Sequence, residues 1–301
     1  QVRTRQRADK NKKVKQKRQE MMDFIARFSA NASKSRQATS RKKALEKLNL
    51  EDMQVSMRRY PYIAFKPERD PGDIILEVEK LGKKNESGEY LFRDLDLRFN
   101  KGEKIAVLSR NAQAITAFFN ILAGEDTEFE GRFQYGQTIS PQYLPNDNTA
   151  FFSGDQDMSL MDWLRQFSKE KDEPFIRGFL GRMLFGGEEV FKRSGVLSGG
   201  EKVRCMMSKI MLANPNFLIL DEPTNHLDLE SITALNNGMK DFTGNMLFSS
   251  HDYQILESVA NRIIEITPNG LIDQYMEYGD YIHSEKIRNL RTELYGDAVH
   301  A

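Results

Sequence analysis

Short apolar runs that end in polar residues recur along the chain, and they predict buried strands of a parallel sheet. The clearest is Phe217–Leu220, four apolar residues followed by Asp221 and Glu222, and residues 246–248 and 105–108 are similar runs. Continuous apolar runs are typical of strands that are covered on both faces. Because the carboxyl ends of such strands meet at the edge where α/β folds bind ligands, we expect the residues that follow them to form a site.

Other stretches predict the remaining layers of an α/β fold. Residues 74–78 and 91–99 are expected to form an antiparallel layer, the second with alternating apolar and polar positions, and residues 262–267 and 271–273 to close the main sheet. Helices are expected at 158–167 and 174–184, within a helical subdomain of about residues 155–196, and from Ser198 through Ile210. The predicted domain has a mixed sheet core over residues 72–285, followed by a polar tail, 286–301, that is a short helix or disordered.

Residues 1–60 have a different pattern, in which narrow apolar stripes at helical spacing alternate with Lys and Arg. Residues 11–28 and about 35–50 each read as a helix, and the small residues 29–33 between them suit a tight turn. Neither stripe could bury enough surface alone, so the pattern predicts two antiparallel helices that form a hairpin arm. Pro61, Pro67 and Pro71 with Gly72 mark a linker into the domain.

The charge of the chain is divided between these parts. The net charge is zero over 301 residues, but residues 1–50 contain 16 Lys/Arg and four Asp/Glu, a net of +12, which leaves −12 for residues 51–301. A basic arm on an acidic body is typical of proteins with a nucleic-acid partner, although a solvated coiled-coil face would show the same charge. Six cations gather around the predicted turn, where a hairpin could reach a phosphate backbone with salt-dependent affinity: Arg27, Lys34, Arg36, Arg41, Lys42 and Lys43.

Three motifs follow one another in an order that resembles an ABC-type ATPase domain. They are Leu197-Ser198-Gly199-Gly200-Glu201, then Asp221-Glu222-Pro223-Thr224-Asn225-His226-Leu227-Asp228, then Ser249-Ser250-His251-Asp252. A helix that opens at Ser198, Gly199 and Gly200 directs N–H groups and the positive end of its dipole at a phosphate. Asp221 is expected to hold Mg²⁺ and Glu222 to orient the attacking water, because phosphoryl transfer depends on positioning and charge stabilisation. The resemblance implies that His251 contacts the γ-phosphate.

The phosphate-binding loop departs from the pattern of that family. Where a Walker A loop needs Gly-x-x-Gly-x-Gly-Lys-Ser/Thr, the chain has Ser109-Arg110-Asn111-Ala112-Gln113-Ala114-Ile115-Thr116. The glycines are absent, Ile115 replaces the lysine, and only Thr116 remains as an expected Mg²⁺ ligand. Losing one charge-assisted contact costs about 1.5–3 kcal/mol, so we expect a degenerate site for this domain's own nucleotide. Asn111 is a good N-cap for an amphipathic helix over residues 112–122, and Arg110 is a minor candidate to replace the missing cation.

The resemblance implies that two further elements of the nucleotide site are eroded. The aromatic residue that stacks on adenine is expected within residues 83–90, where Tyr90 is the available ring. The glutamine that reaches Mg²⁺ is expected within residues 139–145, where Gln142 is present but Leu144 occupies the expected position.

The resemblance becomes narrower at two segments. Residues 27–41 are similar to the tip of the interdomain linker of ABC-F proteins, most closely of the YbiT type, and the run from Asp221 to Asp228 is characteristic of that family and rare in membrane transporters. The chain is thus identified as the second half of an interdomain linker followed by the second ABC domain of a soluble tandem ATPase. The resemblance implies ATP and Mg²⁺ as ligands and the ribosome as partner, with the linker in the E site close to rRNA and the P-site tRNA.

These observations lead to the hypothesis of an asymmetric tandem ATPase. Elements that serve a partner domain's nucleotide, residues 197–201 and 225–228, are intact, whereas those that hold this domain's own nucleotide are largely lost. An upstream ABC domain would carry the competent Walker A loop, and this half alone would hydrolyse ATP weakly or not at all. The alternatives are a non-catalytic ribosome-binding module, a transporter ATPase subunit, and a DNA-repair or chromosome ABC protein, which would need a longer coiled coil.

Three remaining features bear on extent and location. The chain opens at Gln1 inside a charged helical pattern, so we interpret it as part of a longer protein. Its single cysteine, Cys205, excludes an internal disulfide and suits a reducing cytosol. No apolar run approaches the roughly 20 residues that are needed to span a bilayer. We expect a cytoplasmic protein.

Overall fold

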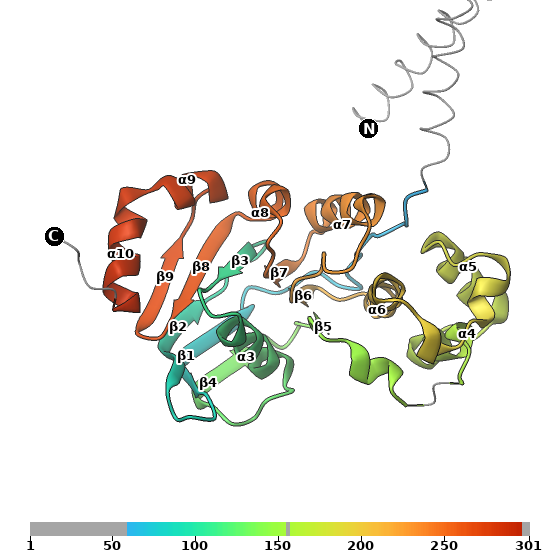
Figure 1. Ribbon diagram of the computed structural model, residues 1–301, viewed down its shortest axis with the longest axis horizontal. Helices are drawn as coiled ribbons and strands as arrows, with labels where there is room; N and C mark the ends of the chain where they lie inside the picture. Colours follow the sequence, from blue (N-terminus) through green and yellow to red (C-terminus); the bar gives the residue numbers. More distant parts are fainter. Residues whose placement is uncertain (1–58, 155–156, 297–301) are drawn as a thin grey trace, which may run out of the picture. The chain divides into compact units, whose positions relative to one another are not determined.

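The computed structural model of the chain describes residues 59–154 and 157–296 (Figure 1). Residues from Tyr60 onward form one compact unit. The predicted arm, residues 1–60, lies almost wholly outside the described residues, and so do its six candidate cations, Arg27, Lys34, Arg36, Arg41, Lys42 and Lys43. Among the residues that the structure describes, every helix is too short or too polar to cross a membrane.

A six-stranded mixed sheet forms the centre of this unit (Figure 1). Its strands are β3 (Lys104–Leu108), β5 (Pro141–Leu144), β6 (Phe217–Leu220), β7 (Asn245–Phe248), β8 (Arg262–Thr267) and β9 (Gly270–Gln274). They lie in the order β5-β6-β7-β3-β8-β9, all parallel except β9, which pairs antiparallel with β8. Every residue of β6 and β7 is buried, which confirms the strands predicted from the continuous apolar runs.

A smaller antiparallel sheet confirms the second predicted layer. It contains β1 (Leu76–Lys84), β2 (Tyr90–Arg98) and β4 (Glu130–Tyr135), in the order β2-β1-β4. The pairing of β1 with β2 shifts in register, and Lys80 and Asp94 adopt a left-handed backbone there, with φ of 46° and 52°. The alternation predicted for residues 91–99 therefore holds from Leu95 to Arg98 but breaks at Arg93 and Asp94, which are both exposed.

The core lies on both faces of the large sheet. Alternate residues of β6 point to opposite faces and show which elements pack on each. Phe217 and Ile219 pack with the antiparallel sheet and with α3 (Ala112–Ala123), whereas Leu218 and Leu220 pack with the helices on the opposite face. In the first cluster, Phe118 of α3 meets Phe92 of β2 edge-on, with 6.1 Å between ring centroids. This packing holds α3, and therefore the turn that leads into it, against the sheet.

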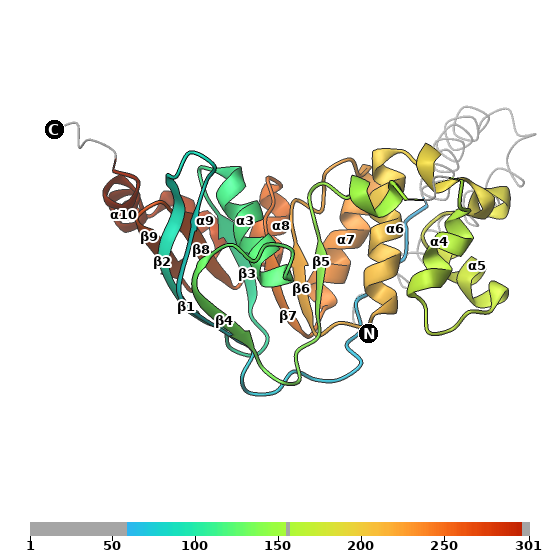
Figure 2. The same ribbon diagram turned by 90° about the horizontal axis from the view of Figure 1, so that it is seen from below.

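Helices cover the second face and form the helical subdomain, in which α4 and α5 lie beyond α6, away from β9 and α10 (Figures 1 and 2). The α-helices after α3 are α4 (Leu160–Phe167), α5 (Glu173–Arg182), α6 (Gly199–Leu212), α7 (Leu229–Asp241), α8 (Tyr253–Val259), α9 (Tyr278–His283) and α10 (Glu285–Tyr295), with 3₁₀ turns at Thr149–Phe152, Gly187–Phe191 and Ser194–Val196. The helices α4, α5 and α6 confirm those expected at 158–167, at 174–184 and after Ser198.

Two segments at the ends of the predicted domain belong to the compact unit, in contrast to expectation. Residues 60–71, read as a linker, bury Ile63 and Phe65, and the N–H of Tyr62 donates to the carbonyl oxygen of Arg182 at 2.8 Å. The tail expected after residue 285 as a short helix or disordered is helix α10, so the helical alternative is confirmed, but its Ile287 is buried in the core. In both segments a few regularly spaced apolar side chains are buried. The predictions of a linker and a tail rested on the prolines and on the polar composition, which do not reveal these side chains.

A buried arginine ties β8 to its two neighbouring strands. Arg262 is 3 % exposed, and its guanidinium donates to Oε2 of Glu103 at 2.8 Å and to Oδ2 of Asp273 at 2.6 Å. A third bond reaches the carbonyl oxygen of Arg98 at 2.9 Å. Arg262 needs these partners, because a buried charge without them is strongly destabilising.

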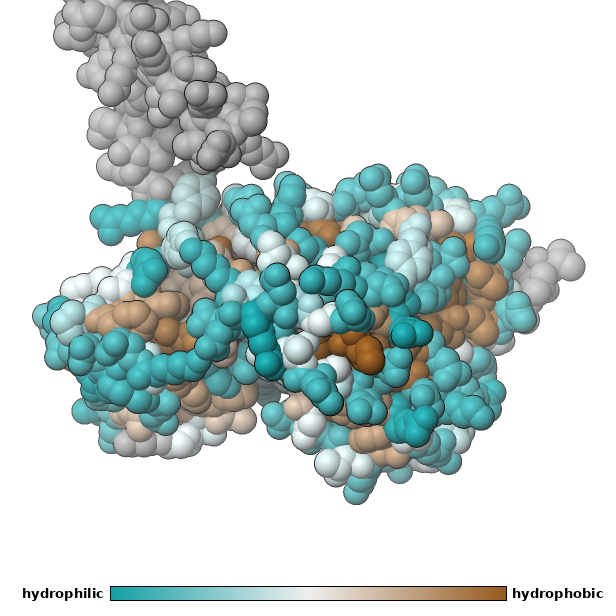
Figure 3. Space-filling model, turned by 180° about the vertical axis from the view of Figure 1, so that it is seen from behind, coloured by the Kyte–Doolittle hydropathy of each residue, from teal (hydrophilic) through white to brown (hydrophobic). Residues whose placement is uncertain are grey.

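Hydrophilic side chains cover most of one face of the molecule, with apolar side chains visible in patches between them (Figure 3).

Replacing Arg262 by methionine tests this ion-pair network. The change leaves the carboxylates of Glu103 and Asp273 without their partner, so Arg262→Met should lower the free energy of unfolding by about 3–5 kcal/mol in urea titrations. The matched control is Arg132→Met, which breaks a pair with Glu79 whose side chains are mostly exposed. That change should cost less than about 1 kcal/mol. Equal losses in the two variants would contradict the assignment.

Candidate functional site

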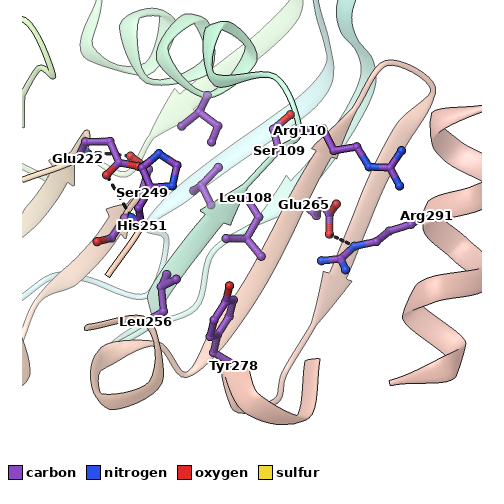
Figure 4. A pocket seen from close by; sticks show the side chains of 13 residues that line it. Leu108, Ser109, Arg110, Glu222, Ser249, His251, Leu256, Glu265, Tyr278 and Arg291 are labelled. Atoms are coloured by element: carbon purple, nitrogen blue, oxygen red, sulfur yellow. Dashed lines mark hydrogen bonds and ion pairs between the residues drawn. The ribbon is translucent and has the colours of Figure 1, made fainter. Parts of the chain in front are cut away.

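The carboxyl ends of β6 and β7 bring the predicted catalytic groups together (Figure 4). Asp221 and Glu222 directly follow β6, and Ser249, Ser250 and His251 directly follow β7, its parallel neighbour. Parallel strands end at the same edge of a sheet, so these side chains converge although they are far apart in sequence.

Asp221 lies at the buried end of this cluster. It is 3 % exposed, its Oδ2 accepts a hydrogen bond from the hydroxyl of Thr116 at 2.8 Å, and its Oδ1 accepts one from the hydroxyl of Ser249 at 2.8 Å. Burial raises the pKa of Asp221, and the two hydroxyl donors oppose that rise. The structure therefore brings together Asp221 and Thr116, the two residues predicted to bind Mg²⁺.

Glu222 and His251 form a second pair beside it. The N–H of His251 donates to Oε2 of Glu222 at 3.2 Å, and its Nε2 lies 3.4 Å from Oε1. The carboxylate is largely buried, which raises the pKa of Glu222, and the neighbouring His251 opposes that rise. Glu222 has φ of 48°, an uncommon conformation for a residue with a side chain, and its N–H donates to the hydroxyl of Ser249 at 2.9 Å. The local backbone thus fixes where this carboxylate points.

The turn before α3 does not have the geometry of a phosphate-binding loop. β3 ends at Leu108 and α3 begins at Ala112, so Ser109, Arg110 and Asn111 alone connect them. The structure confirms the predicted N-cap, because the side chain of Asn111 accepts a hydrogen bond from the N–H of Gln113. Among the described residues, left-handed φ values at non-glycine positions occur at Lys80, Asp94, Leu184, Asn214, Glu222 and His226, and none of these lies in residues 109–116. The predicted loop has become helix.

Four N–H groups in this turn and at the start of α3 have acceptors in the protein. Arg110 N–H donates to the hydroxyl of Tyr295 at 3.1 Å, and Asn111 N–H to the hydroxyl of Ser109 at 3.2 Å. Gln113 N–H donates to Oδ1 of Asn111 at 3.0 Å, and Ala114 N–H donates to the carbonyl oxygen of Asn111 at 3.0 Å. Ile115 and Ala114 are buried. These residues do not fit a triphosphate, which needs N–H groups and a cation directed at its oxygens.

The residues expected to bind Mg²⁺ fit their ligand better than the residues expected to bind phosphate. A carboxylate and a hydroxyl oxygen are ligands that Mg²⁺ prefers, so Asp221 and Thr116 could hold the ion if nucleotide were bound. Next to them a cavity of about 350 Å³ is lined by Ser109 and Arg110 of the turn, by Glu222 and His251, and by Arg291 of α10 (Figure 4). The predicted site residues are thus assembled around a turn that is closed to phosphate.

The signature residues Leu197 to Glu201 open helix α6 as expected. Ser198 caps the helix, because its hydroxyl accepts the N–H of Glu201 at 3.3 Å while the carboxylate of Glu201 accepts the N–H of Ser198 at 2.7 Å. Lys192 pairs with Glu201 at 2.7 Å, and Leu197 is buried in the core. Ser198 and Gly199 are exposed, so this helix end, with its positive dipole, faces solvent.

The segment Asn225 to Asp228 packs against that helix end. A Cβ atom on Gly200 would lie 2.5 Å from the carbonyl oxygen of His226, and one on Gly199 would lie 3.0 Å from its imidazole ring. His226 itself has φ of 66°. Leu227 is partly buried, and Asp228 caps α7 by accepting the N–H of Ser231 at 2.7 Å. The two motifs predicted to serve a partner domain are therefore in direct contact with each other.

Sequence reasoning missed Asn146, which lies shortly after Gln142 and Leu144 in the chain. Gln142 lies within β5 opposite Leu218, and Leu144 is buried opposite Leu220, at the last position of the strand. Asn146 follows the strand end, and its Oδ1 accepts a hydrogen bond from the side-chain amide of Asn225 at 3.0 Å. A side-chain amide two residues after the end of a strand could have identified Asn146, but the bounds of β5 were not predicted.

Tyr90 has protein partners on its ring and on its hydroxyl. The ammonium of Lys84 lies 4.6 Å from the ring centroid and the guanidinium of Arg93 lies 5.7 Å from it. The hydroxyl donates to the carboxylate of Glu130 at 3.1 Å. These partners compete with the stacking on adenine that the family resemblance implies for Tyr90.

Comparisons with known proteins place this chain in a family. Two family models, both described as ABC transporter, match residues 1–65 and 92–225. The chain is 54% identical over 288 residues to YkpA of Bacillus subtilis (strain 168), an uncharacterized ABC transporter ATP-binding protein, covering 95% of this chain and 53% of that protein. It is 41% identical over 288 residues to YbiT of Escherichia coli O157:H7, covering 95% and 54%, and 29% identical over 274 residues to ABC transporter F family member 5 of Arabidopsis thaliana, covering 90% and 39%.

Solved structures agree on the fold. A nucleotide-free ATP-binding cassette from an ABC transporter aligns with a TM-score of 0.56 at 15% identity, over 72% of this chain and 98% of its own. A cassette dimer in a post-hydrolysis state with ADP and phosphate aligns with a TM-score of 0.55, also at 15% identity, over 67% and 98%. The predicted ABC-type α/β fold is confirmed. The chain spans about half the length of the curated relatives it matches.

Replacing Asp221 by asparagine tests the electrostatics of the site. Burial raises the pKa of Asp221 above its ordinary value of 3.8, so its ionised form destabilises the fold at neutral pH. Asp221→Asn should therefore raise the free energy of unfolding at pH 7. The gain should shrink as the pH falls through the raised pKa towards 3.8, because the wild-type carboxyl group then becomes neutral.

Asp147→Asn is the control of opposite sign. Hydrogen bonds from Thr149 lower the pKa of Asp147, so its ionised form stabilises the fold at neutral pH and that contribution disappears in acid. Urea titrations between pH 8 and pH 2 compare the two variants, because the contribution of Asp147 is lost only below its ordinary pKa of 3.8. A loss of stability at pH 7 in Asp221→Asn would contradict the proposed origin of the shift.

Proposed function

The chain belongs to the ABC-F type of ATP-binding-cassette ATPases, and from this premise we propose that it is the signature-donating half of an asymmetric tandem ATPase that acts on the ribosome. ABC domains of this family bind ATP, and the activity of the whole protein is part of the proposal because this chain spans about half of its relatives. We place the protein in the cytoplasm, where ribosomes are found.

One observation carries the proposal: the two nucleotide-facing surfaces of the domain have different geometry. In the turn at residues 109–111, the N–H groups of Arg110 and Asn111 donate to the protein's own oxygen atoms, and Ala114 and Ile115 after it are buried. The start of α6 combines an exposed serine and two glycines with the positive end of a 14-residue helix. This contrast supports a domain that contributes to a nucleotide held by another domain rather than one that holds its own.

Each motif has a role within this proposal. ATP with Mg²⁺, held by the upstream domain, supplies the phosphoryl group that is transferred to water. Ser198 and the N–H groups at the start of α6 would donate hydrogen bonds to its phosphate oxygens. Asn225 to Asp228 position that helix end through His226. Asp221, Glu222 and His251 keep the arrangement of a metal-binding and water-orienting site, although the turn beside them does not fit a triphosphate.

Blocking the helix end tests the role of the signature. In the full-length tandem protein, Ser198→Arg should reduce the rate of ATP hydrolysis about a hundredfold or more, because the transition state loses a donor and the site is obstructed. Ser284→Arg is the matched control, because Ser284 caps α10 in the same way and α10 lies at the other end of the unit from α6 (Figure 1). Unchanged hydrolysis by Ser198→Arg would exclude the signature from catalysis and favour a non-catalytic ribosome-binding module.

The ribosome enters the proposal through the basic segment. Residues 1–50 carry a net charge of +12 and include the segment that resembles an ABC-F linker tip. Cations on a nucleic-acid backbone release counterions, so each contact adds a salt-dependent contribution to affinity. We propose that Arg27, Lys34, Arg36, Arg41, Lys42 and Lys43 contact rRNA and tRNA.

Neutralising these six residues tests the ribosome proposal. Changing all six to glutamine should weaken cosedimentation with ribosomes and flatten its dependence on salt, by a slope of about 0.7–0.9 for each lost phosphate contact. The matched control changes six exposed lysines of the ABC domain to glutamine: Lys80, Lys101, Lys169, Lys171, Lys240 and Lys286. If both sextuple variants bind equally, total charge rather than the arm governs association.

A further inference from the structure

The last helix of the described chain reaches back to the turn between β3 and α3. α10 ends at Tyr295, where Gly296 closes the helix in a left-handed conformation. The hydroxyl of Tyr295 accepts the N–H of Arg110 at 3.1 Å, across 185 residues of sequence. The guanidinium of Arg110 lies over the same ring, 4.1 Å from its centroid. One tyrosine therefore contacts both the backbone and the side chain of the second residue of the turn.

Tyr295 is held in place by a buried glutamate. Glu265 of β8 is 3 % exposed, and its Oε1 accepts the hydroxyl of Tyr295 at 3.0 Å. Its Oε2 accepts the hydroxyl of Tyr281 at 2.7 Å and Nε of Arg291 at 2.7 Å. Burial, together with the charge of Glu265, raises the pKa of Tyr295 to about 12, so the hydroxyl stays protonated and can donate to Glu265 while it accepts from Arg110.

Apolar and backbone contacts fix the helix that carries Tyr295. Ile287 is buried in the core, and Leu290 and Leu294 pack against it. The side-chain amide of Asn269, in the turn between β8 and β9, donates to the carbonyl oxygen of Leu294 at 3.0 Å. Tyr295 is thus anchored to β8, the strand next to β3, and its helix to the turn between β8 and β9, so these anchors lie outside the turn that it contacts.

We propose that Tyr295 is a positioning residue that holds the turn closed against the polyphosphate chain of a nucleoside triphosphate. Backbone N–H groups at a strand-to-helix turn are the donors that bind phosphate oxygens in nucleotide sites. Here the hydroxyl oxygen of Tyr295 accepts one of these donors, and the ring stacks on the cation of the turn. The tyrosine and a triphosphate compete for the same groups. Helix α10 therefore holds the domain's own nucleotide site closed through Tyr295.

Hydrogen exchange tests the contact between Tyr295 and the turn without any nucleotide. In the complete chain, Tyr295→Phe keeps the ring but removes the oxygen, so the Arg110 amide should exchange about three- to tenfold faster. Tyr281→Phe is the matched control, because it also deletes a hydroxyl that donates to Glu265 but does not touch the turn. Its effect on residues 109–116 should stay within about twofold. Equal acceleration in both variants, or no acceleration in Tyr295→Phe, would overturn the proposal.

Nucleotide binding provides the second measurement. Ser109→Gly, Ala112→Gly, Ala114→Gly and Ile115→Lys together restore the full Gly-x-x-Gly-x-Gly-Lys-Thr pattern. Adding Tyr295→Phe to this variant should tighten MgATP binding by a further factor of about three to ten, whereas adding Tyr281→Phe should not. A restored turn that binds MgATP equally well with either tyrosine change would refute the competition.

This inference rests on the proposal that the domain scarcely holds a nucleotide of its own, and the two can fail separately. Low-micromolar MgATP binding by the unaltered chain would contradict the signature-donating function. The exchange rates of the nucleotide-free chain would still decide whether Tyr295 secures the turn.

Discussion

A backbone N–H group that folding removes from water needs an acceptor, and the turn between β3 and α3 finds its acceptors within the protein. Ser109 and Asn111 supply local oxygens, and Tyr295 supplies one from the other end of the domain. In a nucleotide site the same groups would be paired with phosphate oxygens. In our proposal, whether these N–H groups pair with protein or with phosphate oxygens separates a domain that holds a nucleotide from one that only contributes to it.

Two helix starts in this domain have the same capping chemistry but different surroundings. α3 is capped by Asn111 and α6 by Ser198, so each satisfies its first N–H groups with a side chain. α3 continues with alanines and Ile115, whereas α6 continues with Gly199 and Gly200. Glycines let another chain or a ligand approach the backbone closely, which alanine and isoleucine prevent. Side-chain volume next to the cap therefore distinguishes the two ends.

The sequence predicted the parts of the fold that depend on local pattern and missed those that depend on distant partners. β6 and β7 are apolar throughout, so their strands and the residues after them could be read directly. β4 is mostly exposed and β5 contains Pro141 and Gln142, so neither has a clear apolar pattern, and Asn146 was missed with them. Tyr295 contacts Arg110 across 185 residues, and no local signal indicates such a contact.

The contact between His226 and the start of α6 has a consequence for reading related sequences. Any side chain at Gly200 would collide with the carbonyl oxygen of His226, whether or not a phosphate is ever present. Selection for a well-packed fold alone would then preserve this glycine over evolutionary time. A domain could lose ATP hydrolysis altogether and still keep the residues by which an active ATPase is recognised.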